Sequence, residues 1–163
     1  MILGMTTFVF VHVVISLIGI VSGIVVMAGM FGGKRLDGWT AIFLLTTLLT
    51  SLTGFLLPAH GFMPSHGVGI VSVVVLLLAL LGRYTFRLAG GWRRTYVITA
   101  MIALYLNVFV LVAQAFGKVP ALKAMAPTQS APAFLISQVV VMALFVAFTI
   151  AAARGFRNEA GAV

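Results

Sequence analysis

The sequence predicts an all-α polytopic integral membrane protein that forms a single domain over residues 1–163 and crosses the bilayer five times. Of its 163 residues, 63% are hydrophobic and only 7% are charged, whereas a soluble domain carries about 25% charged residues. Five apolar segments are each long enough to cross about 30 Å of hydrocarbon. Basic residues gather at the ends of these segments, as is typical of membrane-spanning helices.

We expect the five transmembrane helices near residues 5–30, 39–58, 67–88, 95–116 and 133–153. In the first, Gly19 and Gly23 are four positions apart, a spacing that lets another helix approach closely, and we expect a packing seam there. Glycines end this helix. Asp37 is then expected to cap the second helix, where the helix dipole favours a carboxylate.

The second segment has two distinct faces. Its hydroxyl-bearing and small residues share roughly 160° of arc, with leucine and phenylalanine opposite: Thr46, Thr47, Thr50, Ser51, Thr53 and Gly54. A helix in lipid gathers hydroxyls on one side when that side faces other helices or a cavity. We therefore expect this segment to be the central helix of the bundle.

The remaining segments add three expectations. The third helix ends near Arg83 and Arg87, whose side chains are expected to extend to the lipid head groups. Residues 117–132 are too apolar for a solvated loop, so they are expected to form a short helix on the membrane surface or to cover the outer mouth of the bundle. The fifth helix follows this loop and carries Gln138.

The basic residues predict the orientation. Two of the ten, Lys118 and Lys123, fall on one side, and the other eight fall on the opposite side: Lys34, Arg35, Arg83, Arg87, Arg93, Arg94, Arg154 and Arg157. The positive-inside rule then places the N-terminus outside and the C-terminus inside a bacterial inner membrane, with anionic lipids at the cytoplasmic side. Because the net charge of +8 is confined to segment ends, we do not expect nucleic acid binding.

Several kinds of chemistry lack the residues they need. The chain has no cysteine, so disulfides and thiolate metal sites are excluded. Its two carboxylates, Asp37 and Glu159, both fall on the inner side, which leaves little material for paired-carboxylate catalysis. No phosphate-binding loop, H-E-x-x-H motif or nucleophile elbow is present. We therefore favour a protein that is not an enzyme.

Uncharged polar residues gather in the expected outer half, and we take them as the candidate ligand-binding site: His12, Thr50, Thr53, His66, Asn107, Gln114 and Gln138. They are compatible with hydrogen bonds between helices. They are also compatible with a pocket for a small molecule such as a quinone. A third interpretation is a haem or copper site that uses His12 with His60 or His66.

Most of the chain resembles a family of small, uncharacterised bacterial inner-membrane proteins. Its first four helices are loosely similar to four-helix b-type cytochrome-like membrane proteins, through His12, the turn Lys34-Arg35-Leu36-Asp37-Gly38 and Leu52-Thr53-Gly54-Phe55. This second resemblance implies haem b held by histidines at two depths. Asp37 stands where those proteins usually place a histidine, and no histidine falls in the inner half, so two stacked haems are not expected.

The first functional hypothesis is a non-enzymatic accessory subunit of a larger membrane complex, or a small-ligand-binding protein with its site in the outer half. The alternative is a redox protein that binds haem b, copper or quinone through His12, His60 and His66. A second alternative is a channel or transporter. It would require a homo-oligomer, because five helices without repeats or a deep charge are poorly suited to alternating access.

Overall fold

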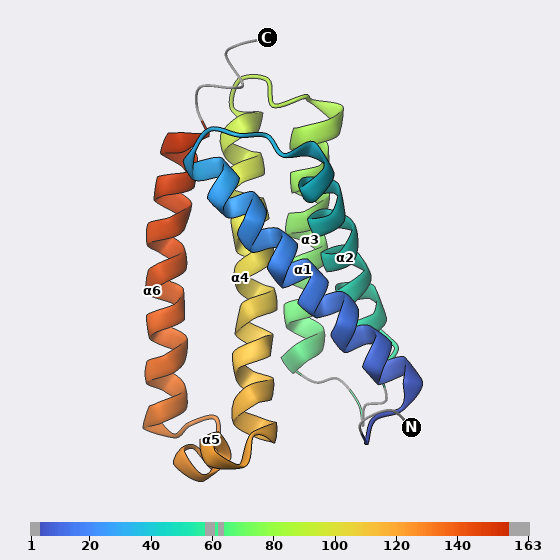
Figure 1. Cartoon of the computed structure of the whole chain (residues 1–163), viewed down its shortest axis with the longest axis vertical. Helices are drawn as coiled ribbons and strands as arrows, with labels where there is room; N and C mark the ends of the chain where they lie inside the picture. The colour runs from blue at the N-terminus through green and yellow to red at the C-terminus, as the bar shows by residue number, and fades with distance from the viewer. Residues whose placement is uncertain (1–3, 58–60, 62–63, 157–163) are drawn as a thin grey trace.

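The structure, a computed structural model, describes residues 4–57, 61 and 64–156. Within these residues every regular element is helical (Figure 1): α1 (Thr7–Phe31), α2 (Asp37–Phe55), α3 (Pro64–Leu80) with its π-helical continuation η1 (Leu81–Thr85), α4 (Trp92–Lys118), α5 (Pro120–Met125) and α6 (Pro132–Gly155). Five of these, counting α3 and η1 as one helix, are long and apolar enough to cross a membrane. The prediction of five membrane-length helices is confirmed, with ends displaced by a few residues.

The central helix is α4, which contacts α1, α2, α3 and α6. It crosses the middle of the bundle, with α6 on one side and α3 on the other (Figure 1). The expectation that the segment 39–58 forms the central helix was wrong. The face of α4 that begins at Tyr96 carries small side chains such as Ala100 and Ala103, and these allow neighbouring helices to pack closely around it.

The buried core lies mainly at one end of the bundle. It joins the last turns of α1, the first half of α2, the end of α3, the first half of α4 and the end of α6. At this end Gly155 touches the backbone of α1. A Cβ atom at Gly155 would lie 2.6 Å from the Met30 carbonyl oxygen, so the two helices meet without an intervening side chain.

The two glycines of the expected packing seam do face other helices. A Cβ atom at Gly23 would lie 2.6 Å from a methyl carbon of Leu104 on α4 and 2.9 Å from the ring of Phe43 on α2. Gly19 faces Thr47 of α2 and Asn107 of α4. The prediction of a packing seam is confirmed.

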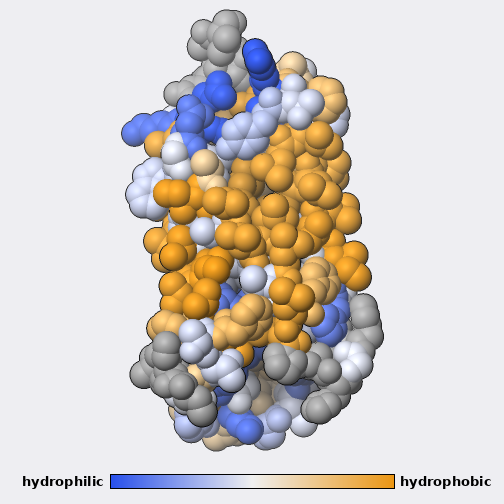
Figure 2. Space-filling model, turned by 90° about the vertical axis from the view of Figure 1, so that its right-hand side faces the viewer, coloured by the Kyte–Doolittle hydropathy of each residue, from blue (hydrophilic) through white to orange (hydrophobic). Residues whose placement is uncertain are grey.

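The loops divide between two polar ends. One end carries the α1–α2 loop, the η1–α4 connection and the end of α6, and the other carries the start of α1 and α5 (Figure 1). The described basic residues therefore fall into the two predicted groups, one at each end of the bundle. Which end faces the cytoplasm remains a prediction. Figure 2 shows a broad apolar band between the two ends, as expected for a surface in contact with lipid.

A short helix forms within residues 117–132, in agreement with the expectation of a short helix in that segment. It is α5, which lies beside the ends of α4 and α6 and does not extend over α1, α2 and α3 (Figure 1). Its described side chains are exposed or half-buried. Its placement on a membrane surface stays a prediction.

Candidate functional site

The outer-half candidate with the most defined geometry is His12 on α1. Its Nδ1 atom lies 2.7 Å from Oγ1 of Thr53 on α2. The same Thr53 hydroxyl lies 2.7 Å from the carbonyl oxygen of Leu49, to which it donates. A threonine hydroxyl has one proton. We therefore assign the Nδ1–H tautomer to neutral His12, which donates to Thr53 and keeps a lone pair on Nε2.

Two other hydroxyls on this face of α2, those of Thr46 and Thr50, follow the same pattern. Thr50 donates to the Thr46 carbonyl oxygen at 2.8 Å, and Thr46 donates to the Ile42 carbonyl oxygen at 2.6 Å. Because these protons are used within α2, the hydroxyl oxygens can only accept hydrogen bonds from neighbouring helices. Thr46, Thr50 and Thr53 therefore present acceptors to neighbouring helices, whereas the Ser51 hydroxyl also lies 3.0 Å from Ser72 Oγ on α3.

Asn107 lies where α1, α2 and α4 meet. Its Nδ2 atom donates to the Ser16 carbonyl oxygen across 3.4 Å. A Cβ atom at Gly19 would lie 3.2 Å from Asn107 Nδ2 and 3.0 Å from Thr47 Oγ1. Thr47 Oγ1 is buried and has no hydrogen-bond partner among the described residues. The Asn107 hydrogen bond joins α4 to α1, as the interpretation of hydrogen bonds between helices expects, and Thr47 of α2 packs against Gly19 beside it.

The remaining candidates lie in other places. Gln138 on α6 donates from Nε2 to the Phe109 carbonyl oxygen of α4 at 3.2 Å. Gln114 is exposed, and the ring of His66 stacks on Phe55 with 6.0 Å between centroids. His60 falls outside the described residues.

The predicted set is thus distributed over several contacts between helices. His12 and Thr53 form one contact, Asn107 a second and Gln138 a third. Among the residues that the structure describes, no group of three or more His, Cys, Asp or Glu side chains is placed to hold a metal ion. The alternative site through His12, His60 and His66 remains a prediction because it includes a residue outside this range.

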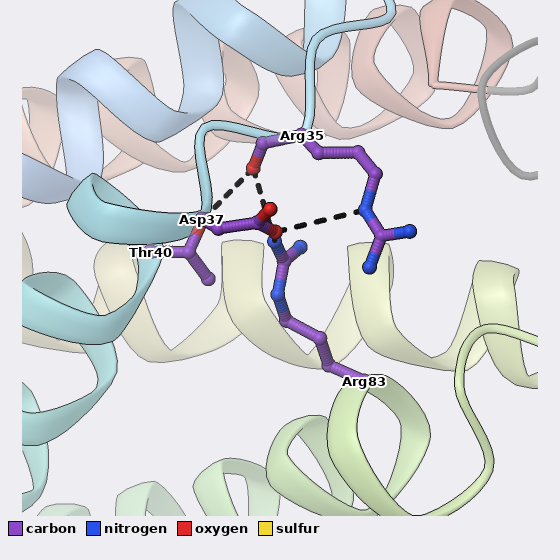
Figure 3. Close-up of polar contacts among 4 residues, drawn as sticks. All are labelled: Arg35, Asp37, Thr40 and Arg83. Carbon is purple, nitrogen blue, oxygen red and sulfur yellow. Dashed lines mark hydrogen bonds and ion pairs between the residues drawn. The ribbon is translucent and has the colours of Figure 1, made fainter.

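Sequence reasoning missed a charged cluster at the basic end (Figure 3). Arg83 of η1 is 3% exposed, so the prediction that its side chain extends to the lipid head groups was wrong. Its Nη2 atom donates to the Asp37 carboxylate and, at 3.1 Å, to the Arg35 carbonyl oxygen. The guanidinium carbon also lies 5.2 Å from the centre of the Tyr96 ring. These contacts, which span the α1–α2 loop, η1 and α4, replace the water that a cation would otherwise keep.

Asp37 has a different role from the predicted cap. Helix α2 begins at Asp37 itself, and Leu36 at the cap position makes no side-chain hydrogen bond to the helix. The carboxylate still lies in the first turn, where the helix dipole favours negative charge. It contacts Arg83 and lies 3.6 Å from Arg35 Nε. Its main structural partner is therefore an arginine 46 positions further along the chain.

The backbone that carries Arg83 departs from regular α-helix. The π-helical turn η1 follows α3 and contains Gly82, where a Cβ atom would lie 3.1 Å from the Trp92 carbonyl oxygen. Two non-glycine residues with positive φ follow, Arg87 at 48° and Leu88 at 61°. Each such residue costs about 1–2 kcal/mol. Leu88 is buried, and its N–H donates to the Gly82 carbonyl oxygen at 2.8 Å, which offsets part of this cost.

Comparison with known protein families, curated proteins and solved structures finds no match to this chain. The two resemblances described above therefore stay predictions. Function has to be argued from the geometry of the chain itself.

Proposed function

We propose that this chain is a bacterial inner-membrane protein, with its N-terminus outside and its C-terminus in the cytoplasm, that binds a small ligand in its outer half and catalyses no reaction itself. Five membrane-length helices support the multi-pass arrangement. The basic residues at the end that carries the α1–α2 loop support the orientation, because cytoplasmic loops are enriched in lysine and arginine. The absence of cysteine and the scarcity of carboxylates support a binding role over catalysis.

The observation that carries the binding proposal is the hydrogen-bonding state of His12. With Nδ1–H donated to Thr53 at 2.7 Å, the ring is held in one orientation and Nε2 presents a lone pair. A half-buried imidazole nitrogen of this kind is suited to accept a hydrogen bond from a ligand hydroxyl. A quinol carries such a hydroxyl, whereas an oxidised quinone offers only acceptors. The proposed ligand is therefore a small apolar molecule with a hydroxyl group, such as a reduced quinone.

The same nitrogen also favours one alternative. Histidines that bind metals usually donate their other ring N–H to a fixed acceptor, and Thr53 is such an acceptor for His12. A haem iron or copper(I) ion bound at Nε2 would then make this a redox protein. A second histidine would be needed, and His60 and His66 are the only other histidines in the sequence.

The two possibilities are separated by a direct experiment on the purified full-length protein in detergent. A short-chain quinol is titrated into the protein, and its affinity is compared with that of His12→Ala and of Gln114→Ala, whose parent side chain is exposed. We expect His12→Ala to weaken quinol binding by about tenfold, the value of one hydrogen bond of about 1.4 kcal/mol. Gln114→Ala should bind as the parent does.

Equal quinol affinity for the parent and His12→Ala would contradict the proposed site. Absorption spectra of the oxidised and dithionite-reduced protein, with metal analysis of the same sample, test the alternative. A haem Soret band or stoichiometric copper that is lost in His12→Ala would establish the redox function instead.

The orientation is tested separately. A reporter that is active only in the cytoplasm is fused after Val163 or after Lys123. We expect activity from the first fusion and none from the second, because the two positions fall on opposite sides of the proposed membrane. The reverse result would contradict the orientation without affecting the ligand site.

A further inference from the structure

A half-open cavity of about 480 Å³ lies at the basic end of the bundle. His12 lies near the opposite end, close to the start of α1. Its volume falls within the range of about 300–1,000 Å³ that is common for small-molecule sites. It is lined by Arg35, Arg83, Tyr84, Arg87, Leu88, Ala89 and Gly90. The residues come from the loop before α2, from η1 and from the turn before α4, so the cavity forms only in the folded bundle.

Two arginine nitrogens of residues that line this cavity are buried and make no hydrogen bond within the described part of the chain, Arg35 Nε and Arg83 Nη1. Arg83 is 3% exposed, and its Nη2 atom is occupied by Asp37 and by the Arg35 carbonyl oxygen. Its Nη1 atom is buried and makes no hydrogen bond within the described part of the chain. A buried charged donor that lacks an acceptor is costly. Both nitrogens belong to guanidinium groups of residues that line the cavity, and their positive charge would attract an anion there.

The charge of the lining also favours an anion. Three of its side chains are guanidinium groups, those of Arg35, Arg83 and Arg87. Asp37 is the only carboxylate in the described residues and is paired with Arg83. The local charge of these four groups is therefore about +2, and arginine always keeps its charge.

The backbone around the cavity is fixed in an unusual conformation. Leu36, Arg87 and Leu88 have φ values of 45°, 48° and 61°, a region that non-glycine residues seldom adopt. Leu36 precedes Asp37, and the other two residues place the turn that closes the cavity. Such strain is often found at binding sites, and two of these three residues, Arg87 and Leu88, line the cavity.

From these observations we propose that the cavity binds a phosphate-bearing anion, with the guanidinium groups of Arg35, Arg83 and Arg87 forming the site. Guanidinium groups match phosphate oxygens with paired, charge-assisted hydrogen bonds. The cavity lies at the end of the membrane-length helices, at the level where lipid head groups would be. Basic cavities between transmembrane helices are known sites for phosphate-containing head groups. The phosphate can therefore come from an anionic lipid or from a soluble ion.

The test uses the delipidated full-length protein in neutral detergent. Thermal unfolding is followed as potassium phosphate is added, against potassium chloride at equal ionic strength. A parallel series adds phosphatidylglycerol, against phosphatidylcholine, to the micelles. A ligand that binds only the folded protein raises the unfolding temperature in a saturable way. Arg87→Gln and Arg35→Gln test the site, and Arg154→Gln is the matched control, since Arg154 is exposed at the same end but does not line the cavity.

We expect a saturable rise in the unfolding temperature, with a half-saturating concentration at least about tenfold higher in Arg87→Gln and Arg35→Gln and unchanged in Arg154→Gln. A rise with potassium phosphate identifies a soluble ion as a source. A rise with phosphatidylglycerol alone identifies a lipid head group. No rise with either compound would overturn the proposal, as would equal half-saturating concentrations in Arg87→Gln, Arg35→Gln and Arg154→Gln.

Discussion

Removal of the Asp37 carboxylate should destabilise the bundle through Arg83, which it leaves as a buried cation with fewer partners. Arg83 would retain the Arg35 carbonyl oxygen at 3.1 Å and the Tyr96 ring at 5.2 Å. We propose Asp37→Ala, Arg83→Met and the double variant as the perturbation. Together they form a double-mutant cycle that isolates the interaction between the two side chains.

The expected magnitude follows from the exposure of the two partners. Breaking a fully buried ion pair costs about 3–5 kcal/mol. Here the Arg83 side chain is 1% exposed but the Asp37 side chain is 75% exposed, so water already solvates the carboxylate. A single hydrogen bond to a charged group contributes about 1.5–3 kcal/mol. We therefore expect Asp37→Ala to lower the free energy of unfolding by about 2 kcal/mol, or about thirtyfold in the equilibrium constant.

The double variant should be more stable than Asp37→Ala alone, because methionine removes the unpaired cation while it fills much of the same space. Unfolding by SDS in mixed micelles, followed by circular dichroism and tryptophan fluorescence, measures all four proteins. Trp92 is a suitable fluorescent probe because it stacks on Phe86 with 4.2 Å between ring centroids. The control is Arg94→Met, at an exposed position of α4.

Two results would refute this reasoning. One is a coupling energy below about 0.3 kcal/mol, which is within the error of additive, independent sites. The other is an Asp37→Ala variant as stable as Arg94→Met. Either result would mean that the buried guanidinium does not depend on its carboxylate partner.

Three further substitutions test the packing. Gly155→Ala should lower the free energy of unfolding by about 1–3 kcal/mol, because the new Cβ atom would lie 2.6 Å from the Met30 carbonyl oxygen. The control Gly117→Ala, whose new Cβ atom would have no atom within 4 Å, should not lower it. Equal thermal midpoints for the two variants would contradict the close contact at Gly155. Asn107→Leu should cost less than about 1 kcal/mol in the SDS titration, since hydrogen bonds between membrane helices average about 0.6 kcal/mol; a loss above 2 kcal/mol would indicate a larger role. Thr53→Val should lower the free energy of unfolding by a similarly small amount. It should also weaken quinol binding, because His12 loses the hydrogen bond that fixes its tautomer. Unchanged quinol affinity would show that this tautomer is not required for binding.

Much of the architecture could be predicted from the sequence because the bilayer acts on each segment separately. Length and apolarity decide whether a segment such as 133–153 can span hydrocarbon, and α6 forms there over Pro132–Gly155. Glycine spacing indicates a close helix contact, as at Gly23 against Leu104. These properties are local, so they can be read from consecutive residues.

The candidate sites were harder to predict because they depend on how the helices rotate and cross. Helical periodicity places Thr53 on the polar face of α2 but does not show that His12 is its partner 41 positions away. Helical periodicity also places Asn107 and Gln114 on one face of α4, yet Asn107 is buried and Gln114 is exposed. The packing distributes the polar residues over separate helix contacts.

The sequence by itself determined the number of membrane-length helices, their approximate ends and the separation of charge between the two ends of the bundle. Only the tertiary structure decided that α4 is central, that Arg83 is buried and that its partner is Asp37. The physical reason is that burial of a cation depends on distant groups that replace its water. For Arg83 these are the carboxylate of Asp37 at the start of α2, the carbonyl oxygen of Arg35 in the α1–α2 loop and the ring of Tyr96 on α4, which come together only when the helices pack.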